Sequence, residues 1–427
     1  MAVAQLEIPS TREQKTQWDY DIAIVGAGIV GATLACALKD SGLKLVSIDL
    51  LPQELAASKQ QAYALTLLSG RILSGLGLWS EILPHVTTFR QISLSDTNQS
   101  FVQFRLADLG TDALGYVASH RVLLTTLQQS LNQSDNITWL CPAEVLEVDY
   151  QADAVKIAVN KAGQRLWLQT RLLVAADGGR SPIRAQAGIG THGWKYWQSC
   201  VSTTIKPEKC HDNIAYERFW PTGPMGVLPL PGNRCQVVWT APHAEAKALQ
   251  ELDEAEFLAL LEQRTAGQLG RLELAIPRAL YPVQLMQSDR YVKPRLALIG
   301  DAAHCCHPVG GQGLNMGIRD AAALAELLVR AHQTDSDIGD IRILQPYENW
   351  RQRENMVILG FTDFLDRIFS NNWIPVVALR RLGLWMLRSF RPFRYLALRL
   401  MTGLGGRSPE LARRSRQETH RKLKIEN

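Results

Sequence analysis

The feature that most constrains the fold of this chain is a glycine-rich turn near its start. The apolar, β-branched residues 21–25 have the pattern of a buried strand, a helical pattern follows the turn, and a second strand pattern ends in Asp49. The turn itself contains Gly26, Gly28 and Gly31. In such a βαβ unit the first glycine permits the tight turn, the second lets a pyrophosphate approach the backbone, and the third allows close packing. Because a carboxylate at the position of Asp49 can hold ribose hydroxyls, these residues predict a dinucleotide site.

A second glycine-rich segment lies far along the chain. Residues 296–299 have the pattern of a buried strand and end at Gly300 and Asp301. Residues 308–320 then read Pro-Val-Gly-Gly-Gln-Gly-Leu-Asn-Met-Gly-Ile-Arg-Asp and lead into a helical pattern. Backbone amides at the start of a helix stabilise anionic groups such as phosphate. This segment therefore predicts a further contact with an anionic ligand.

A third segment combines a carboxylate, a glycine turn and an arginine. The strand pattern at residues 172–176 is followed by the run Asp-Gly-Gly-Arg-Ser-Pro-Ile-Arg, which contains Asp177, Gly178 and Arg184. Such a turn suits ribose hydroxyls and phosphates, although an ordinary surface turn has a similar composition.

Together the three segments resemble those of the class A flavoprotein monooxygenases, and most closely those of the ubiquinone-biosynthesis hydroxylases. The resemblance covers about residues 19–353 and implies that FAD is bound and that Asp301 binds its ribityl chain. It also implies that the amides of residues 311–315 approach the pyrophosphate and the isoalloxazine ring, and that the segment with Asp177 serves both FAD and NAD(P)H. The FAD-binding residues implied in these two segments are Asp177, Gly178, Arg184, Gly300, Asp301, Gly311, Gln312, Gly313, Leu314 and Asn315.

The same resemblance places other residues near the flavin. Arg121 matches a basic residue that contacts the flavin, and Val145 matches a backbone contact to the adenine. His307 and Pro308 match positions that face the flavin. The chain departs from the family at Gln61, where many relatives have an arginine, so hydrogen bonding is kept and a positive charge is lost. No catalytic acid or base is assigned.

A metal site is not expected. His304, Cys305, Cys306 and His307 are neighbours in the sequence, and such neighbours rarely face one ion. The seven cysteines are scattered without a C-x-x-C pair, which argues against zinc and against a disulfide framework. A reducing cytoplasm is the expected location.

Length and the order of these patterns predict two domains with appendages. At 427 residues the chain is too long for one ordinary domain. Alternating apolar and polar residues at about 90–105 and 199–241 predict an antiparallel sheet that interrupts the nucleotide domain. The predicted fold is α/β: a discontinuous Rossmann-type FAD-binding domain, an antiparallel β-sheet substrate domain and a C-terminal helical region. The predicted ranges are 1–18 for a flexible extension, 19–89, 115–190 and 285–350 for the FAD-binding domain, 90–114 and 191–284 for the substrate domain, and 351–427 for a basic amphipathic helical region.

The C-terminal region is strongly basic. From Arg380 to the end the chain has thirteen Lys or Arg against three Glu, so the preceding residues carry a net charge of −5. A helix over residues 373–390 and its continuation would place Arg380, Arg381, Arg388 and Arg391 on one face of about 100°, with an apolar remainder. Such an element suits an anionic membrane surface, whereas the alternative is a cap docked on the protein body or on a partner. Nucleic acid is not expected, because no nucleic-acid module accompanies the charge.

The resemblance implies an FAD-dependent monooxygenase that hydroxylates an aromatic ring, here a prenylated phenol of quinone biosynthesis. NAD(P)H would reduce the FAD, O2 would add at C4a, and the resulting hydroperoxide would deliver a hydroxyl group to an electron-rich ring. Two alternatives stay open: an FAD-dependent epoxidase or reductase of an isoprenoid lipid, and a non-catalytic flavoprotein that scaffolds a lipid-biosynthetic complex. Contact between the cytoplasmic protein and a membrane surface, through the C-terminal region, is a further expectation.

Overall fold

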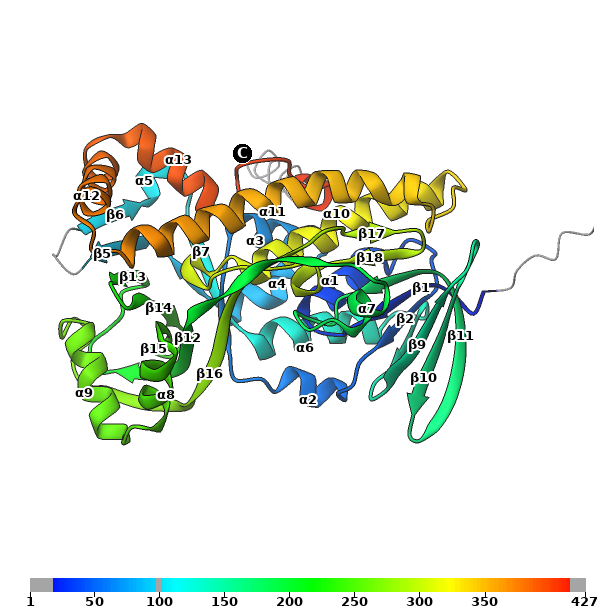
Figure 1. Ribbon diagram of the computed structural model, residues 1–427, viewed down its shortest axis with the longest axis horizontal. Helices are drawn as coiled ribbons and strands as arrows, with labels where there is room; N and C mark the ends of the chain where they lie inside the picture. The colour runs from blue at the N-terminus through cyan, green and yellow to red at the C-terminus, as the bar shows by residue number, and fades with distance from the viewer. Residues whose placement is uncertain (1–17, 97–100, 415–427) are drawn as a thin grey trace, which may run out of the picture.

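The computed structural model describes residues 18–96 and 101–414. The protein is built on two eight-stranded sheets and one three-stranded sheet, with helices around them (Figure 1). The fold is therefore α/β, as predicted. The predicted flexible extension, residues 1–18, lies outside the described residues except for Trp18.

The first sheet carries the Rossmann-type unit. Its strand order is β17-β18-β11-β1-β2-β8, and the pairings along this path are parallel except for β17 with β18. Central residues such as Ile22 and Ile24 are fully buried, which is typical of parallel sheets covered on both faces. The strands are β1 (Tyr20–Val25), β2 (Leu45–Ile48), β8 (Ile137–Leu140), β11 (Gln164–Ala175), β17 (Val292–Lys293) and β18 (Leu296–Leu298), and β9 (Glu144–Tyr150) and β10 (Val155–Lys161) join through β11.

Two helices of this unit begin next to each other. They are α1 (Ile29–Leu38), directly after the first glycine-rich turn, and α10 (Gly313–Gln333), directly after the second. Their first turns touch, because a Cβ at Gly317 would lie only 2.6 Å from the Val30 side chain. The absence of a side chain at position 317 therefore lets the two helix N-termini approach each other. A third helix, α6 (His120–Asn132), packs against α1.

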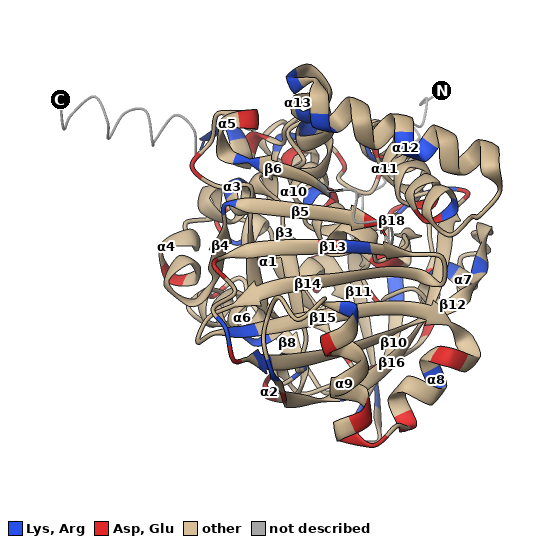
Figure 2. Ribbon diagram, turned by 90° about the vertical axis from the view of Figure 1, so that its left-hand side faces the viewer, with Lys and Arg blue, Asp and Glu red and all other residues tan. Residues whose placement is uncertain are grey.

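The second sheet has the order β19-β16-β12-β15-β14-β13-β5-β6 and is antiparallel except for the pair of β13 and β5. Its neighbouring strands β5, β13, β14 and β15 are seen side by side in Figure 2. The strands are β5 (Gln91–Asp96), β6 (Phe101–Arg105), β12 (Thr191–Pro207), β13 (Ile214–Trp220), β14 (Gly223–Leu230), β15 (Arg234–Pro242), β16 (Leu272–Ser288) and β19 (His304–Cys305). The chain thus leaves the first sheet more than once to build the second, while the exact domain borders stay a prediction.

The remaining elements are a small third sheet, short helices and 3-10 turns. The three-stranded sheet has the order β3-β7-β4. The remaining elements are β3 (Ala62–Leu65), β4 (Thr87–Phe89), β7 (Gly115–Ser119), α2 (Gln53–Ala57), α3 (Leu67–Gly75), α4 (Trp79–Ile82), α5 (Leu106–Leu109), α7 (Pro182–Gln186), α8 (His243–Glu251), α9 (Glu254–Arg264) and the 3-10 turns η1 (Leu83–His85), η2 (Gly300–Ala302) and η3 (Val309–Gly311).

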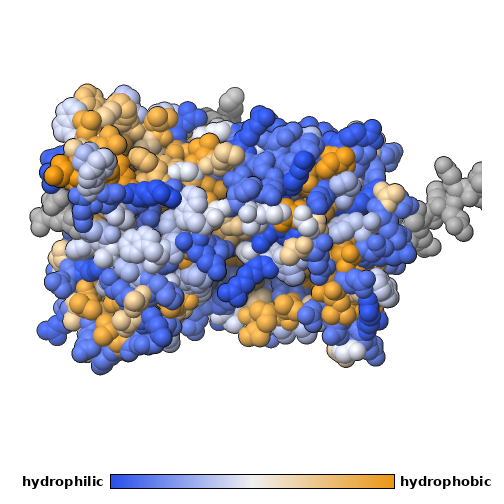
Figure 3. Space-filling view, viewed as in Figure 1, coloured by the Kyte–Doolittle hydropathy of each residue, from blue (hydrophilic) through white to orange (hydrophobic). Residues whose placement is uncertain are grey.

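Three helices form the C-terminal region: α11 (Ile341–Phe369), α12 (Ile374–Ser389) and α13 (Arg391–Met401). In Figure 1, α11 runs along most of the molecule, and α12 and α13 contact β6 and α5 respectively. Figure 3 shows hydrophobic side chains gathered over α12 and α13, at the upper left. None of the helices in the described part of the chain has the length and apolar character needed to span a bilayer.

The predicted face of four arginines is not present. Arg380 is only 6% exposed, and its guanidinium donates hydrogen bonds to the carbonyls of Ile368 and Phe369 at 3.3 and 3.1 Å. These carbonyls end α11, where a cation satisfies unpaired acceptors and the helix dipole. Arg391 belongs to the next helix and donates to the Ala107 carbonyl at 3.1 Å. The prediction was wrong because Arg380 turns inward and the helix breaks before Arg391.

Candidate active site

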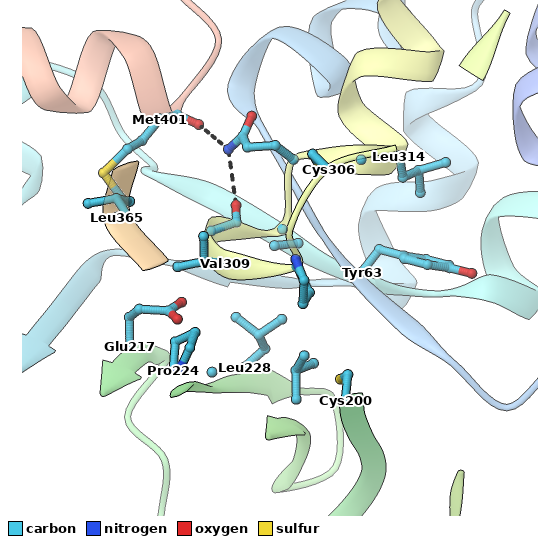
Figure 4. Close-up of a pocket in the computed structure, with 18 of the residues that line it drawn as sticks. Tyr63, Cys200, Glu217, Pro224, Leu228, Cys306, Val309, Leu314, Leu365 and Met401 are labelled. Carbon is cyan, nitrogen blue, oxygen red and sulfur yellow. Dashed lines mark hydrogen bonds between the residues drawn. The ribbon is translucent and has the colours of Figure 1, made fainter. Parts of the chain in front are cut away.

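A large cavity lies between the two sheets and the C-terminal helices. Its volume is about 1250 Å³, which exceeds what one drug-sized ligand needs. One half is lined by the glycine-rich segments, including Gly28 and Asp301. The other half is lined by apolar side chains of the second sheet such as Phe219 and Leu228, and Figure 4 shows Leu228 facing Val309 across it. The cavity thus joins a polar and an apolar compartment.

The first glycine loop is shaped by close backbone contacts. Gly26 has φ +103°, and a Cβ at Gly31 would lie 1.9 Å from the Gly26 carbonyl oxygen. Asp49 accepts a hydrogen bond from the backbone amide of Ala27 at 2.7 Å, so its carboxylate also holds the loop. A Cβ at Gly28, by contrast, would meet no described heavy atom within 4 Å. The loop is therefore rigid around Gly26 and Gly31 and open to the cavity at Gly28.

Asp301 presents a carboxylate to the same half of the cavity. Its side chain lines the cavity and is exposed there. Burial raises the pKa of this carboxyl, and the nearby His304 partly offsets the effect. An ionised carboxylate accepts hydrogen bonds from hydroxyl groups, which is the chemistry that a ribityl chain requires.

The loop before Asp301 is held by a buried ion cluster centred on Asp320. Asp320 accepts a hydrogen bond from the Gly300 amide at 3.1 Å, lies 2.5 Å from His304 Nε2, and pairs with Arg351 Nε at 2.8 Å. Burial disfavours the carboxylate, but His304 and Arg351 outweigh it and lower the pKa of Asp320 to about 2. Asp320 was not predicted as a site residue, because its partners lie 16 and 31 residues away and only the fold joins them.

The turn before α10 is clamped to β3. Gly310 and Gly311 have φ of +70° and +60°, a conformation that glycine adopts readily. Asn315 is fully buried, and its amide donates to the carbonyls of Ala64 and Gly311 at 2.8 and 2.7 Å. The Asn315 side chain therefore fixes the turn from behind. Residues 311–314 line the cavity.

The structure places His307 differently from the expectation that it faces the flavin. Its side chain is fully buried, and Pro308 lines the cavity instead. The Val309 amide donates to His307 Nδ1 at 3.2 Å, and Nε2 lies 3.1 Å from Gln198 Oε1. Burial lowers the pKa of His307 to about 3, so the ring is neutral and donates from Nε2. His307 is thus a positioning residue for the turn.

The third segment is tied to the second by Arg184. Its guanidinium donates to the carbonyls of Ala302 and Gly179 at 2.7 and 2.9 Å. Within this segment the arginine that lines the cavity is Arg180, which was not predicted as a site residue. One Asp177 oxygen accepts from a backbone amide, and the other is buried without a partner among the described residues. Burial raises the pKa of Asp177.

Near Gln61 a short hydrogen-bonded chain lines the cavity. The Tyr63 hydroxyl donates to Gln61 Oε1 at 3.0 Å and lies 3.2 Å from His120 Nδ1. His120 Nε2 lies 3.0 Å from the Ala56 carbonyl. Arg121, the next residue, is exposed at the start of α6 and does not line the cavity. The side chain that reaches the site from this helix is therefore His120.

The predicted site residues thus fall into two groups. Those that line the cavity are Gly28, Gln61, Gly178, Asp301, Pro308, Gly311, Gln312, Gly313 and Leu314. Those that lie behind the lining or away from it are Gly26, Gly31, Asp49, Arg121, Val145, Asp177, Arg184, Gly300, Asn315 and His307.

The cavity wall fits FAD. Gly28 leaves open space at the N-terminus of α1, and the backbone of residues 311–314 lines the same cavity at the N-terminus of α10. Helix N-termini attract phosphate, and the carboxylate of Asp301 suits sugar hydroxyls. Gly28, Asp301 and residues 311–314 would hold the cofactor.

Comparison with known proteins agrees with this geometry. The family described as "FAD binding domain" matches residues 19–356. The chain is 38% identical over 400 residues to the ubiquinone hydroxylase UbiL of Rhodospirillum rubrum, with 92% of each chain covered. It is 31% identical over 394 residues to the 3-demethoxyubiquinol 3-hydroxylase of Escherichia coli, covering 91% of this chain and 100% of that protein.

Among solved structures, the chain is similar to the p-nitrophenol 4-monooxygenase PnpA of Pseudomonas putida. The TM-score is 0.77 at 20% identity, and the match covers 91% of this chain and 98% of that one. At this identity the likeness concerns the fold. Since the family match spans most of the chain and both relatives cover nine-tenths of it, the protein belongs to the FAD binding domain family and is an FAD-dependent monooxygenase.

Proposed function

We propose that the enzyme hydroxylates the aromatic ring of a prenylated phenol in the biosynthesis of a ubiquinone-type quinone, with NAD(P)H and O2 as co-substrates. The observation that carries this proposal is the division of the cavity into a glycine-rich half and an apolar half. The names of the two relatives, a ubiquinone hydroxylase and a demethoxyubiquinol hydroxylase, support the substrate class.

The apolar half suits a ring that carries a hydrocarbon chain. Its wall includes Phe89, Ile92, Leu94, Phe104, Phe219, Leu228, Leu365 and Met401. The lining continues to Phe364, Phe393 and Leu396, whose exposed fractions are 52%, 44% and 67%. These three residues belong to α11 and α13, so an apolar path leads from the cavity to the outer surface. A ring can occupy the cavity while an isoprenoid tail follows this path.

The cofactor and the protein side chains have different functions in this proposal. Bound FAD would supply electron transfer from NAD(P)H and activation of O2. The amides of residues 311–314 and the Asp301 carboxylate orient that cofactor, while Phe219 and Leu228 exclude water from the ring. Exclusion of water matters because it suppresses side reactions.

Purified protein with NAD(P)H, O2 and a farnesylated phenol is expected to oxidise NAD(P)H and to form a product heavier by one oxygen atom, with the tail double bonds intact. Acid precipitation should release FAD into the supernatant, because no covalent attachment pattern is recognisable in the sequence. Absorbance of NAD(P)H and product mass are the readouts. Oxygen on a tail double bond, or loss of one, would identify the epoxidase or reductase alternative. Flavoprotein that neither oxidises NAD(P)H nor modifies the phenol would support the scaffold alternative.

The outer face of the C-terminal helices supports a peripheral contact with a membrane. Within residues 364–396 the large apolar side chains that are at least 44% exposed are Phe364, Trp373, Ile374, Leu379, Leu382, Trp385, Phe390, Phe393, Tyr395 and Leu396. Arg381 and Arg388 are exposed on the same helix as several of them. A large apolar patch bordered by arginines and rich in aromatic residues suits the interface of an anionic bilayer. The path from the cavity opens within this patch, which gives a membrane-embedded tail direct access.

Full-length protein is expected to pellet with vesicles of anionic phospholipid. The triple variant Ile374→Ser, Leu382→Ser and Trp385→Ser should bind roughly tenfold more weakly or worse, because it removes exposed apolar area. None of these residues lines the cavity, so FAD content should stay unchanged. Replacing Arg381 and Arg388 by glutamine should cost about 1 kcal/mol per arginine, and mainly at low salt.

Arg380→Gln is the matched control for these arginine variants. Because Arg380 is buried against the end of α11, its loss should lower the temperature of unfolding and leave vesicle binding of the folded protein unchanged. Equal sedimentation of wild type and the triple variant would refute the membrane contact.

A further inference from the structure

Glu217 places a carboxyl group in the apolar half of the cavity. It lies on β13, where it lines the cavity together with Ala215 and Phe219. Side chains two positions apart on a strand point to the same face, so an acid occupies an inward position whose neighbours are apolar. Figure 4 shows its side chain among the residues that line this cavity, together with Val309 and Pro224.

The surroundings of Glu217 accommodate the carboxylate but leave part of it open to a ligand. The backbone amide of Gly310 lies near enough to favour the carboxylate and to lower its pKa. Space beside it is kept free by Gly226, since a Cβ there would stand 3.6 Å from Glu217 Oε2. A carboxylate has about four acceptor sites, and one amide can serve only one of them. Because burying unsatisfied polar groups costs free energy, the remaining sites favour a ligand that donates hydrogen bonds.

The pKa of Glu217 is not influenced by the other titratable groups of the cavity wall. These are Lys59, Tyr63, His120, Arg180, Cys200, Tyr216, Tyr281, Asp301, Cys305, Cys306 and Arg399. None of them is a cause of the shift of Glu217, whose pKa burial raises to about 7 against the opposing effect of the Gly310 amide. A carboxyl group with such a pKa gains and loses a proton near neutral pH, as a general base in an enzyme requires.

We infer that Glu217 is a catalytic residue that accepts the hydroxyl proton of the phenolic substrate during ring hydroxylation. The inference rests on the proposed function. The phenolic O–H bond breaks, its proton moves to the Glu217 carboxylate, and the electron pair stays on oxygen and enriches the ring. A ring electron pair then forms the new C–O bond to the hydroxyl group of the oxygen donor, which keeps the electrons of the bond it loses. The ring carbon releases its hydrogen as a proton to water, and Glu217 returns its own proton to the phenolic oxygen.

Glu217→Gln tests this role, because it keeps the size of the side chain and an acceptor for Gly310 but cannot take the proton. FAD content and the rate of flavin reduction by NAD(P)H should match wild type. Hydroxylation of a farnesylated phenol should fall about 10²- to 10⁴-fold, with H2O2 formed in place of product. The wild-type hydroxylation rate should rise with pH through about 7, where the carboxylate forms, and this limb should vanish in the variant. Ring-fluorinated phenols, which ionise more readily, should restore part of the rate.

Glu273→Gln is the matched control on the same sheet. The Glu273 side chain is 75% exposed beside Lys206, and the variant should behave as wild type. Equal hydroxylation by wild type and Glu217→Gln would overturn the inference. Loss of FAD from Glu217→Gln would also overturn it, because the residue would then serve only the Gly310 turn.

A binding measurement separates this inference from the proposed function. An alkylated nitrophenol absorbs at longer wavelength when ionised, so its spectrum reports where the proton lies. Bound to wild type it should absorb as the phenolate, and bound to Glu217→Gln as the neutral phenol. Identical spectra in the two proteins would overturn the role of Glu217 whether or not the enzyme hydroxylates any phenol. Failure of wild type to hydroxylate, with the spectral difference present, would instead count against the proposed function.

Discussion

Asp320→Asn is expected to lower the free energy of unfolding by about 3–5 kcal/mol, the usual cost of removing one partner of a buried ion pair. The carboxylate is fully buried and pairs with Arg351 at 2.8 Å and His304 at 2.5 Å. In the variant the Arg351 guanidinium stays buried with less compensation for its charge. Because Asp320 also accepts a hydrogen bond from the Gly300 amide, the loop with Asp301 should loosen and FAD should dissociate more readily. Denaturant unfolding and flavin content measure the two effects.

The same cluster predicts a dependence of stability on pH. Burial opposes ionisation of Asp320, but His304 and Arg351 lower its pKa from 3.8 to about 2. A carboxyl with a lowered pKa stabilises the folded protein above its ordinary pKa, and this contribution is lost as the pH falls from about 4 to about 2.

The exposed pair of Asp340 and Arg342 provides the control for this cluster. The Arg342 side chain is 86% exposed, and asparagine also caps helix N-termini well, so Asp340→Asn should leave the denaturation midpoint almost unchanged. If Asp320→Asn and Asp340→Asn unfold at the same denaturant concentration, the buried cluster does not anchor the loop.

Gly31→Ala is expected to yield protein with little FAD and a lower temperature of unfolding. A Cβ at position 31 would lie 1.9 Å from the carbonyl oxygen of Gly26, far inside contact distance. The loop or α1 must therefore move, and overpacking of a close contact costs about 1–3 kcal/mol or more. Thermal unfolding and the flavin absorbance of the purified variant are the measurements.

Gly28→Ala should lower FAD affinity without lowering the stability of the fold. Its φ is −69° and a Cβ there meets no described heavy atom within 4 Å, so stability should change by less than about 0.5 kcal/mol. The methyl group would stand where the pyrophosphate has to approach the backbone, and FAD affinity should fall about tenfold or more. Full flavin content in Gly28→Ala would mean that the pyrophosphate does not approach this loop.

The glycine-rich segments could be predicted from the sequence because their chemistry is local. The order of strand, turn and helix around Gly26 and the glycines at 310 and 311 are properties of a few neighbouring residues. Positive φ values at Gly26, Gly310 and Gly311 agree with that local requirement. The resemblance to flavoprotein monooxygenases rested on the same segments, and the family match confirms it.

The arginines illustrate what local pattern does not decide. Arg184 and Arg180 lie in one short motif, yet Arg184 binds backbone carbonyls and Arg180 lines the cavity. Arg380 and Arg381 are adjacent on a helix, yet Arg380 is buried and Arg381 is exposed. The side chain of an arginine orients toward unpaired carbonyl groups or toward solvent. The positions of these carbonyl groups and of the solvent-exposed surface depend on other elements of the fold.

By itself the sequence determined the α/β class, the glycine loops and the cofactor, because these depend on residues within a few positions of each other. Only the tertiary structure decided that His304, Asp320 and Arg351 form one cluster and that Glu217 enters an apolar cavity. A lone glutamate in a strand pattern carries no signal of its own. Its significance comes from the apolar side chains and the glycine turn that the fold places around it, since burial and the choice of partners govern the chemistry of a carboxyl group.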